Sequence, residues 1–240
     1  MRERPVTRFL FRDDAYARRC EATVTAVDER GIQLDDTLLY FSSGGQPGDR
    51  GTLTAADGRT VAIADTIRGP AFGDVLHVAV RDAPPLSVGD RVSVELDWER
   101  RYRHMRLHTC MHLLCAVVAA PVSGGQIHDD RARLDFDMHG VALDKANIEE
   151  RLNALISAGH SVQTRWITDE ELAASPELVR TMSVKPPTGA GRVRLLDIPG
   201  VDLQACGGTH VANTAEIGRI AVIDVLSKGK QNRRVIIGFA

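Results

Sequence analysis

The run WERRYRHMRLHTCMHLLCAVVAAP, residues 98–121, divides the sequence into two parts of different character. Its apolar residues recur at helical spacing, it contains no glycine, and Pro121 ends the pattern. These features predict a helix from about Glu99 to Ala119. Before Trp98 apolar and polar residues alternate instead, as they do in β-strands. We therefore expect a domain junction here, with domains at residues 1–97 and 98–240.

The first part has the pattern of a small β-barrel or sandwich. Alternation is visible in residues 21–41, 51–65, 74–80 and 90–98, and turn signals recur every 8–12 residues. The segment SSGGQPGDRG, residues 42–51, interrupts this pattern with four glycines and a proline. It is too rich in these residues to be a regular element, so we expect a Gly-rich loop.

The second part mixes helical and strand patterns. LDKANIEERLNALISAG, residues 143–159, predicts an amphipathic helix that Gly159 closes. Thr168 and Glu171 have the spacing of a capping box, and Ser175-Pro176 marks the start of a further short helix. RVRLLDI, GRIAVIDVLS and RRVIIGFA then predict strands. The fold class expected for the whole chain is α+β, a small β-barrel domain followed by a mixed domain with an antiparallel sheet and helices.

The predicted long helix carries His108 and His112 at positions i and i+4. That spacing places two imidazoles on one helix face, where both can point at one metal ion. Cys110 lies two positions from each histidine, so it faces elsewhere and is not expected to be a ligand. Taken alone, the pair is also consistent with two solvated or capping histidines.

A second candidate half-site is CGGTH, residues 206–210. Two adjacent glycines make a poor helix and a poor strand, so the segment predicts a turn that brings Cys206 and His210 together. With His108 and His112 it completes a Cys-His₃ set suited to Zn²⁺. The halves are 94 residues apart, and spacing alone does not show that the fold closes this gap.

Four segments resemble, in order, the motifs of the alanyl-tRNA editing domain: RLHTCMHLL, GGQIHDDRARLDFD, DIPGVDLQACGGTHVANTAEIGRI and SKGKQNRRVIIGF. The Gly-rich loop resembles the segment that precedes this domain in the same family. The two-part layout is similar to that of the stand-alone AlaX-like editing proteins. The related editing domain of threonyl-tRNA synthetase shares the two histidine-containing halves, but GVDLQACGGTH favours the alanyl branch.

The resemblance implies a zinc-dependent hydrolase that deacylates tRNA(Ala) mischarged with serine, with Gly-tRNA(Ala) as a further substrate. It implies zinc ligands at His108, His112, Cys206 and His210. It implies a substrate pocket that includes Gln126, Gly207 and Gly208, with Thr109 placed to meet the serine hydroxyl. Four protein ligands leave zinc no open position unless it becomes five-coordinate or loses one ligand.

A general base does not stand out. Asp129, Asp130 and Asp135 follow Gln126 and are candidates, although each also fits a loop or surface carboxylate. Two basic clusters are candidates for tRNA contact, because arginines interleaved with aromatic residues suit phosphate contact and base stacking. They are Arg100, Arg101 and Arg103 with Trp98 and Tyr102, and Lys228, Lys230, Arg233 and Arg234. A solvated charged face is the alternative for both.

The composition excludes some other classes of protein. The net charge is −2, so contacts with nucleic acid must be local rather than spread over the surface. No apolar run approaches the length of a membrane span, and the N-terminus lacks the apolar core of a signal peptide, so we expect a cytoplasmic protein without membrane association. Two other functions stay open: a non-catalytic RNA-binding module with a structural zinc, and an editing hydrolase that acts on Ser-tRNA(Thr).

Overall fold

The computed structural model describes residues 7–71, 73–138, 141–182, 191–229 and 231–240. The chain forms two compact units, Met1–Ser43 with Pro47–Tyr102 and Gly44–Gln46 with Arg103–Ala240. The boundary between these units falls inside helix α1 (Trp98–Val118), and three residues of the Gly-rich loop belong to the second unit. The simpler division into residues 1–97 and 98–240 stays a prediction.

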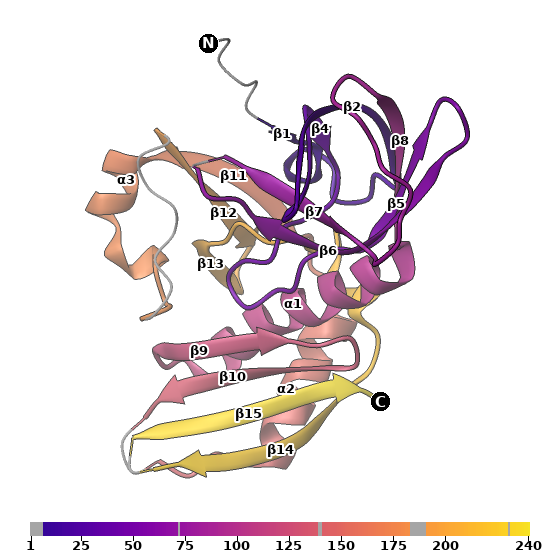
Figure 1. Cartoon of the computed structure of the whole chain (residues 1–240). Coiled ribbons are helices and arrows are strands. Elements are labelled where there is room, and N and C mark those ends of the chain that lie inside the picture. Colours follow the sequence, from indigo (N-terminus) through magenta and orange to yellow (C-terminus); the bar gives the residue numbers. More distant parts are fainter. Residues whose placement is uncertain (1–6, 72, 139–140, 183–190, 230) are drawn as a thin grey trace. The chain divides into compact units, whose positions relative to one another are not determined.

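The first unit is built on a closed barrel with strand order β2-β3-β7-β6-β5-β8 (Figure 1). Its strands are β2 Arg19–Asp28, β3 Gly31–Leu34, β5 Gly51–Ala55, β6 Thr60–Arg68, β7 Val75–Ala79 and β8 Arg91–Leu96. All neighbouring pairs are antiparallel. The α+β class with an initial small barrel is therefore confirmed.

The barrel interior follows from the period-two pattern of its strands. In β8, Val92, Val94 and Leu96 are buried, and the residues between them are more exposed. Val94 lies opposite Leu53 of β5, and both side chains have no exposed surface. Alternation of this kind directs one side of every strand into a shared apolar core and so closes the barrel.

Two very short strands of the first unit escape sequence prediction. β1 (Arg8–Phe9) pairs in parallel with β4 (Asp36–Thr37), and the 3₁₀ turn η1 (Leu10–Arg12) follows β1. A two-residue strand has no periodicity to detect. Phe11 of η1 packs edge-on against Tyr40, with ring centroids 5.3 Å apart, so an aromatic cluster covers this region.

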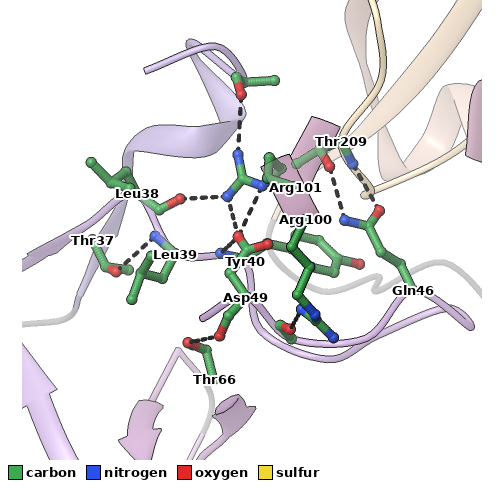
Figure 2. Close-up of polar contacts among 12 residues, drawn as sticks. Thr37, Leu38, Leu39, Tyr40, Gln46, Asp49, Thr66, Arg100, Arg101 and Thr209 are labelled. Atoms are coloured by element: carbon green, nitrogen blue, oxygen red, sulfur yellow. Dashed lines mark hydrogen bonds and ion pairs between the residues drawn. The ribbon is translucent and has the colours of Figure 1, made fainter. Parts of the chain in front are cut away.

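Arg101 is the largest fully buried side chain among the described residues. Its guanidinium forms an ion pair with Asp49 and also donates to the carbonyl oxygens of Leu38 (2.7 Å) and Ala15 (3.1 Å) (Figure 2). The Asp49 carboxylate also accepts from the backbone N–H of Tyr40 at 2.6 Å. A buried charge needs such partners. The expectation that Arg101 contacts tRNA is therefore wrong, because no part of this side chain reaches the surface.

The second unit contains two antiparallel sheets, of order β14-β15-β10-β9 and β11-β12-β13 (Figure 1). The strands of the first sheet are β9 Val122–Ile127, β10 Arg131–Asp137, β14 Ile220–Lys228 and β15 Asn232–Phe239. Those of the second are β11 Gln163–Thr168, β12 Arg192–Ile198 and β13 Asp202–Ala205. The helical elements are α1, α2 Lys145–Ser157, α3 Asp169–Ala174, η2 Pro176–Leu178 and η3 Thr214–Ile217.

The helices of this unit begin where the sequence places their caps. Asp144 caps α2 by accepting from the N–H groups of Ala146 and Asn147. Thr168 and Glu171 form the predicted capping box at the start of α3. Helix α1 matches its predicted bounds within one residue, and every residue from 107 to 115 is buried. A helix enclosed in this way must satisfy its polar side chains inside the protein.

Strands β9, β11 and β13 are not predicted by periodicity. β9 contains Gly124 and Gly125, β13 has four residues, and five of the six residues of β11 are exposed. These strands form because neighbouring strands supply backbone hydrogen bonds, which no local pattern reports. In the part of the chain that the structure describes, no helix is both long and apolar enough to cross a membrane.

His77 is buried in the barrel wall and hydrogen-bonded at both ring nitrogens. Its Nδ1 lies 2.9 Å from the carbonyl oxygen of Ile32, which can only accept, so Nδ1 carries the hydrogen. Its Nε2 then accepts from the Thr37 hydroxyl at 2.8 Å. Burial lowers the pKa of His77 to about 4, against a hydrogen bond to Ile32 that raises it.

This histidine should make the protein less stable in acid. Because its pKa is lower in the folded state, the unfolded chain takes up a proton below pH 6.5 that the folded chain refuses until about pH 4. The free energy of unfolding should fall across that range by about 3 kcal/mol from this residue. Urea unfolding from pH 7 to pH 4 should therefore show a steeper loss for the wild type than for His77→Gln. Equal slopes would refute the assignment.

Candidate metal centre

Four side chains from two distant segments converge in the second unit. His108 and His112 come from α1, and Cys206 and His210 from the turn between β13 and η3. One potential ligand atom from each lies within 4.8 Å of all the others. Cys206 Sγ is 3.5 Å from His108 Nε2 and 3.2 Å from His210 Nε2. The fold thus closes the 94-residue gap between the two halves.

The helix and the turn place the three imidazoles against one another. The ring centroids of His108 and His112, one helical turn apart, are 5.5 Å apart. The His210 ring lies 4.3 Å from His108 and 5.0 Å from His112. All three histidines are buried. The cluster is therefore a preformed group of donors, with its three imidazoles buried and Cys206 half-buried.

Buried Arg194 of β12 holds the CGGTH turn in place. Its Nη1 donates to the carbonyl oxygens of Cys206 (3.2 Å) and Gly208 (2.7 Å). The backbone N–H of Cys206 donates in return to the Arg194 carbonyl at 3.0 Å. These bonds satisfy turn carbonyls inside the protein and fix the direction of the cysteine side chain.

The two glycines of the turn differ in their surroundings. A Cβ atom added to Gly208 would lie 2.5 Å from His108 Nδ1 and 2.9 Å from the Gln46 side-chain oxygen. A Cβ atom added to Gly207 would meet nothing within 4 Å. Gly208 is thus required for the close approach of the turn to α1, whereas Gly207 is exposed and has room.

The Nδ1 atoms of His112 and His210 are hydrogen-bonded away from the cluster. His112 Nδ1 donates to the Asp202 carboxylate at 2.9 Å. The Thr109 hydroxyl donates to the Met105 carbonyl, so it accepts from His210 Nδ1 at 3.2 Å. His210 then presents the lone pair of Nε2, and His112 presents it once its second proton is released, as in histidines that ligate metals. Imidazole nitrogens with one sulfur are a donor set that fits zinc.

The charges of the cluster suit a cation. Burial alone would raise the pKa of the Cys206 thiol, but His108, His210 and His112 outweigh it and hold that pKa well below its usual value. The thiolate is the form that binds metals. Burial also opposes charge on His112, yet Cys206 and Asp202 raise its pKa to about 9. The negative field that favours a proton there would equally favour a metal ion.

The pKa of His210 shifts in the opposite direction from that of His112. Burial lowers its pKa well below the usual value, and His108 adds to that effect. Neutral imidazole is the ligating form of histidine. Cys110 is fully buried, and burial raises its pKa to about 12, so it stays a thiol. Among the described residues, the cluster includes the four side chains and not Cys110, as expected.

Two of the predicted substrate contacts have other partners. The hydroxyl of Thr109 is buried, bonded to Met105, His210 and the backbone N–H of Val211. It lies on the Nδ1 side of His210 and supports that ring; its contact with a serine hydroxyl stays a prediction. Gln126 lies on β9 with an exposed side chain that accepts from Arg133 at 3.2 Å. The adjacent Gly125 faces Met111 of α1, so Gln126 points to the other face of the sheet.

The structure also places the three carboxylates that are candidates for a general base. Asp135 is bound by Arg234 (2.6 and 2.8 Å) and Arg133 (2.5 Å). Although burial opposes it, these arginines lower the pKa of Asp135, which makes it a weaker base. Asp129 lies 2.9 Å from buried His104, and Asp130 is exposed. The described metal cluster includes none of the three.

Of the other predicted tRNA-binding residues, Arg103 and Lys228 are exposed. Arg100 donates to the Gly48 carbonyl at 2.6 Å, and Arg233 to the Val141 carbonyl at 3.0 Å. Arg234 has its charge balanced by Asp135. Lys230 lies outside the described residues.

Sequence reasoning missed Gln46, Asp202 and Arg194, which contact the cluster without belonging to it. Gln46 comes from the Gly-rich loop and lies 2.8 Å from His108 Nδ1. Asp202 is fully buried beside His112, with Arg180 3.4 Å away. Gln46 and Asp202 lie inside segments that the sequence analysis quotes as motifs, and Arg194 lies in a predicted strand, but the sequence does not indicate which atoms these residues contact.

Comparison with known proteins places both units among tRNA synthetase relatives. Residues 193–236 match the model of the threonyl and alanyl tRNA synthetase second additional domain, and residues 12–100 match the class II (A) tRNA synthetase model. The chain is also 33% identical to alanine–tRNA ligase of Sulfurisphaera tokodaii, covering 92% of this chain and 25% of the ligase. The fold and the site thus define a relative of the synthetase-associated domains.

Similarity over nearly the whole chain identifies the particular family within these synthetase relatives. The chain is 36% identical to alanyl-tRNA editing protein AlaX-M of Methanosarcina acetivorans, over 96% of this chain and 98% of that protein. It is 33% identical to the protein of the same name from Saccharolobus solfataricus, over 96% and 98%. The chain belongs to the AlaX-M family of alanyl-tRNA editing proteins.

The difference between the two glycines gives a matched pair of variants. Gly208→Ala should push the His108 ring out of place and weaken zinc binding at least tenfold, because ligand geometry would be lost. Gly207→Ala should bind zinc as the wild type does. Competition with a chromogenic chelator measures both affinities. If the two variants bound zinc equally well, the close packing of Gly208 on His108 would have no role in the site.

Proposed function

We propose that this protein is a zinc-dependent hydrolase that removes serine, and also glycine, from mischarged tRNA(Ala). The observation that carries the proposal is the convergence of Cys206 and three histidines within 4.8 Å. Membership of the alanyl-tRNA editing family supports the choice of tRNA(Ala).

The residues proposed to hold zinc are His108, His112, Cys206 and His210. Bound there, zinc supplies Lewis-acid activation of a water molecule or of a carbonyl oxygen. The chain contributes the rest: Asp202 and Thr109 fix two imidazole rings through Nδ1, and Arg194 fixes the turn that carries Cys206. Prepositioned groups in a water-poor site need little reorganisation during reaction.

A specific observation also favours a second function. Four protein ligands around zinc are typical of structural sites, whereas catalytic sites usually keep one position open. A non-catalytic RNA-binding module with a structural zinc is therefore the competing proposal. Chelation distinguishes the two, since removal of a structural zinc unfolds the domain and removal of a catalytic zinc stops turnover with a smaller change in structure.

Deacylation tests the proposed function directly. Zinc-loaded protein should release serine from Ser-tRNA(Ala) but leave Ala-tRNA(Ala) and Ser-tRNA(Thr) intact, and chelated protein or His108→Ala should be inactive. Circular dichroism of the same samples reports whether the fold survives. Binding of all three tRNAs without release would support the structural alternative, and release from Ser-tRNA(Thr) alone would change the substrate.

We propose Arg103 and Lys228 as contacts to the tRNA backbone, because both are exposed. Long-range attraction to phosphates raises affinity and makes it depend on salt. In the same assay, the double Arg103→Ala, Lys228→Ala variant should raise KM, flatten its salt dependence and leave kcat unchanged. An unchanged salt dependence would remove these residues from the binding surface.

A further inference from the structure

The structure assigns to Gln46, in the Gly-rich loop, the role of positioning residue for the metal centre. We infer that it sets the ring orientation of His108 and ties the CGGTH turn to α1. This inference deepens the proposed function and rests on the proposed zinc site. Gln46 touches no reacting group, so its action on the site passes through His108 and Thr209.

The side chain of Gln46 is buried and bonded at both of its polar atoms. Its amide nitrogen donates to the Thr209 hydroxyl at 2.8 Å (Figure 2). Its amide oxygen accepts from the backbone N–H of Thr209 at 3.1 Å and lies 2.8 Å from His108 Nδ1. The residue is 1% exposed, so no solvent competes for these bonds.

These contacts determine which nitrogen of His108 carries the hydrogen. A backbone N–H can only donate, so the atom of Gln46 that faces Thr209 N must be the amide oxygen. That oxygen can only accept, so His108 Nδ1 must be the donor. Nε2 is then left with its lone pair, directed toward Cys206. Gln46 thus does for His108 what Asp202 does for His112.

Gln46 also connects the two halves of the centre. His108 is 62 residues away along the chain and Thr209 is 163 residues away. One amide group holds the α1 half against the turn half. Without it, both buried partners would lose a hydrogen bond, and the His108 ring would have no acceptor at Nδ1.

The loop before Gln46 is itself fixed on the second unit. The carbonyl oxygen of Gly45 accepts from the N–H of Ile127 at 2.8 Å. Gly45 has a φ of +85°, and a Cβ atom there would lie 2.5 Å from the Gly125 oxygen, so glycine is required. The glycine before Gln46 therefore serves to bring the loop close enough for the glutamine to reach the cluster.

Two substitutions at Gln46 separate hydrogen bonding from packing. Gln46→Met keeps the approximate volume but removes every hydrogen bond, and it should weaken zinc binding ten- to a hundredfold, the usual cost of losing a group that orients a ligand. Gln46→Glu keeps an acceptor for both His108 and Thr209, and it should stay within about threefold of the wild type. Gln163→Met, at an exposed position on β11, is the matched control and should change nothing.

Zinc affinity is measured by chelator competition on full-length protein, with circular dichroism to verify folding. The inference is overturned if folded Gln46→Met binds zinc as the wild type does, or if Gln46→Glu loses as much affinity as Gln46→Met. This readout is independent of hydrolysis. If the wild type released no serine from any tRNA, the proposed function would fail, while the zinc affinities would still decide the role of Gln46.

Discussion

The constraint on which the second unit depends is the burial of polar side chains around α1. Three buried imidazoles and a half-buried cysteine converge there, and each buried polar atom left without a partner would cost about 1–3 kcal/mol. The fold meets this cost with side chains from the Gly-rich loop, from α1 itself and from β13. Gln46, Thr109 and Asp202 each face one Nδ1 atom, so the same bonds that stabilise the buried rings also orient them.

Much of this arrangement can be predicted from the sequence because it is local. Helix α1, the capping box at Thr168 and the barrel strands follow from periodicity and capping chemistry. The four clustered residues follow from two short spacings and a family resemblance. Gln46 could not be assigned in this way, since its partners are 62 and 163 residues away and only the folded chain brings them together. Strand β9, with two glycines, owes its formation to pairing with β10.

A cluster of basic residues in the sequence predicts function less well than metal-ligand residue types at a fixed spacing. Arg100, Arg101 and Arg103 are neighbours in the sequence, yet Arg101 is buried against Asp49 while Arg103 is exposed. A run of arginines at the start of a helix does not say which of them face water. In the first unit the Arg101–Asp49 pair joins the start of α1 to the segment that follows Gly48, and so it has a structural role.

We propose that three Nε2 atoms and one thiolate bind a single zinc ion. X-ray absorption spectroscopy of the zinc-loaded protein tests it most directly, because sulfur and nitrogen ligands differ in distance. We expect one sulfur at about 2.3 Å and nitrogen ligands at about 2.0–2.1 Å, with the sulfur lost in Cys206→Ser. A zinc shell without sulfur in the wild type, or no stoichiometric zinc, would contradict it.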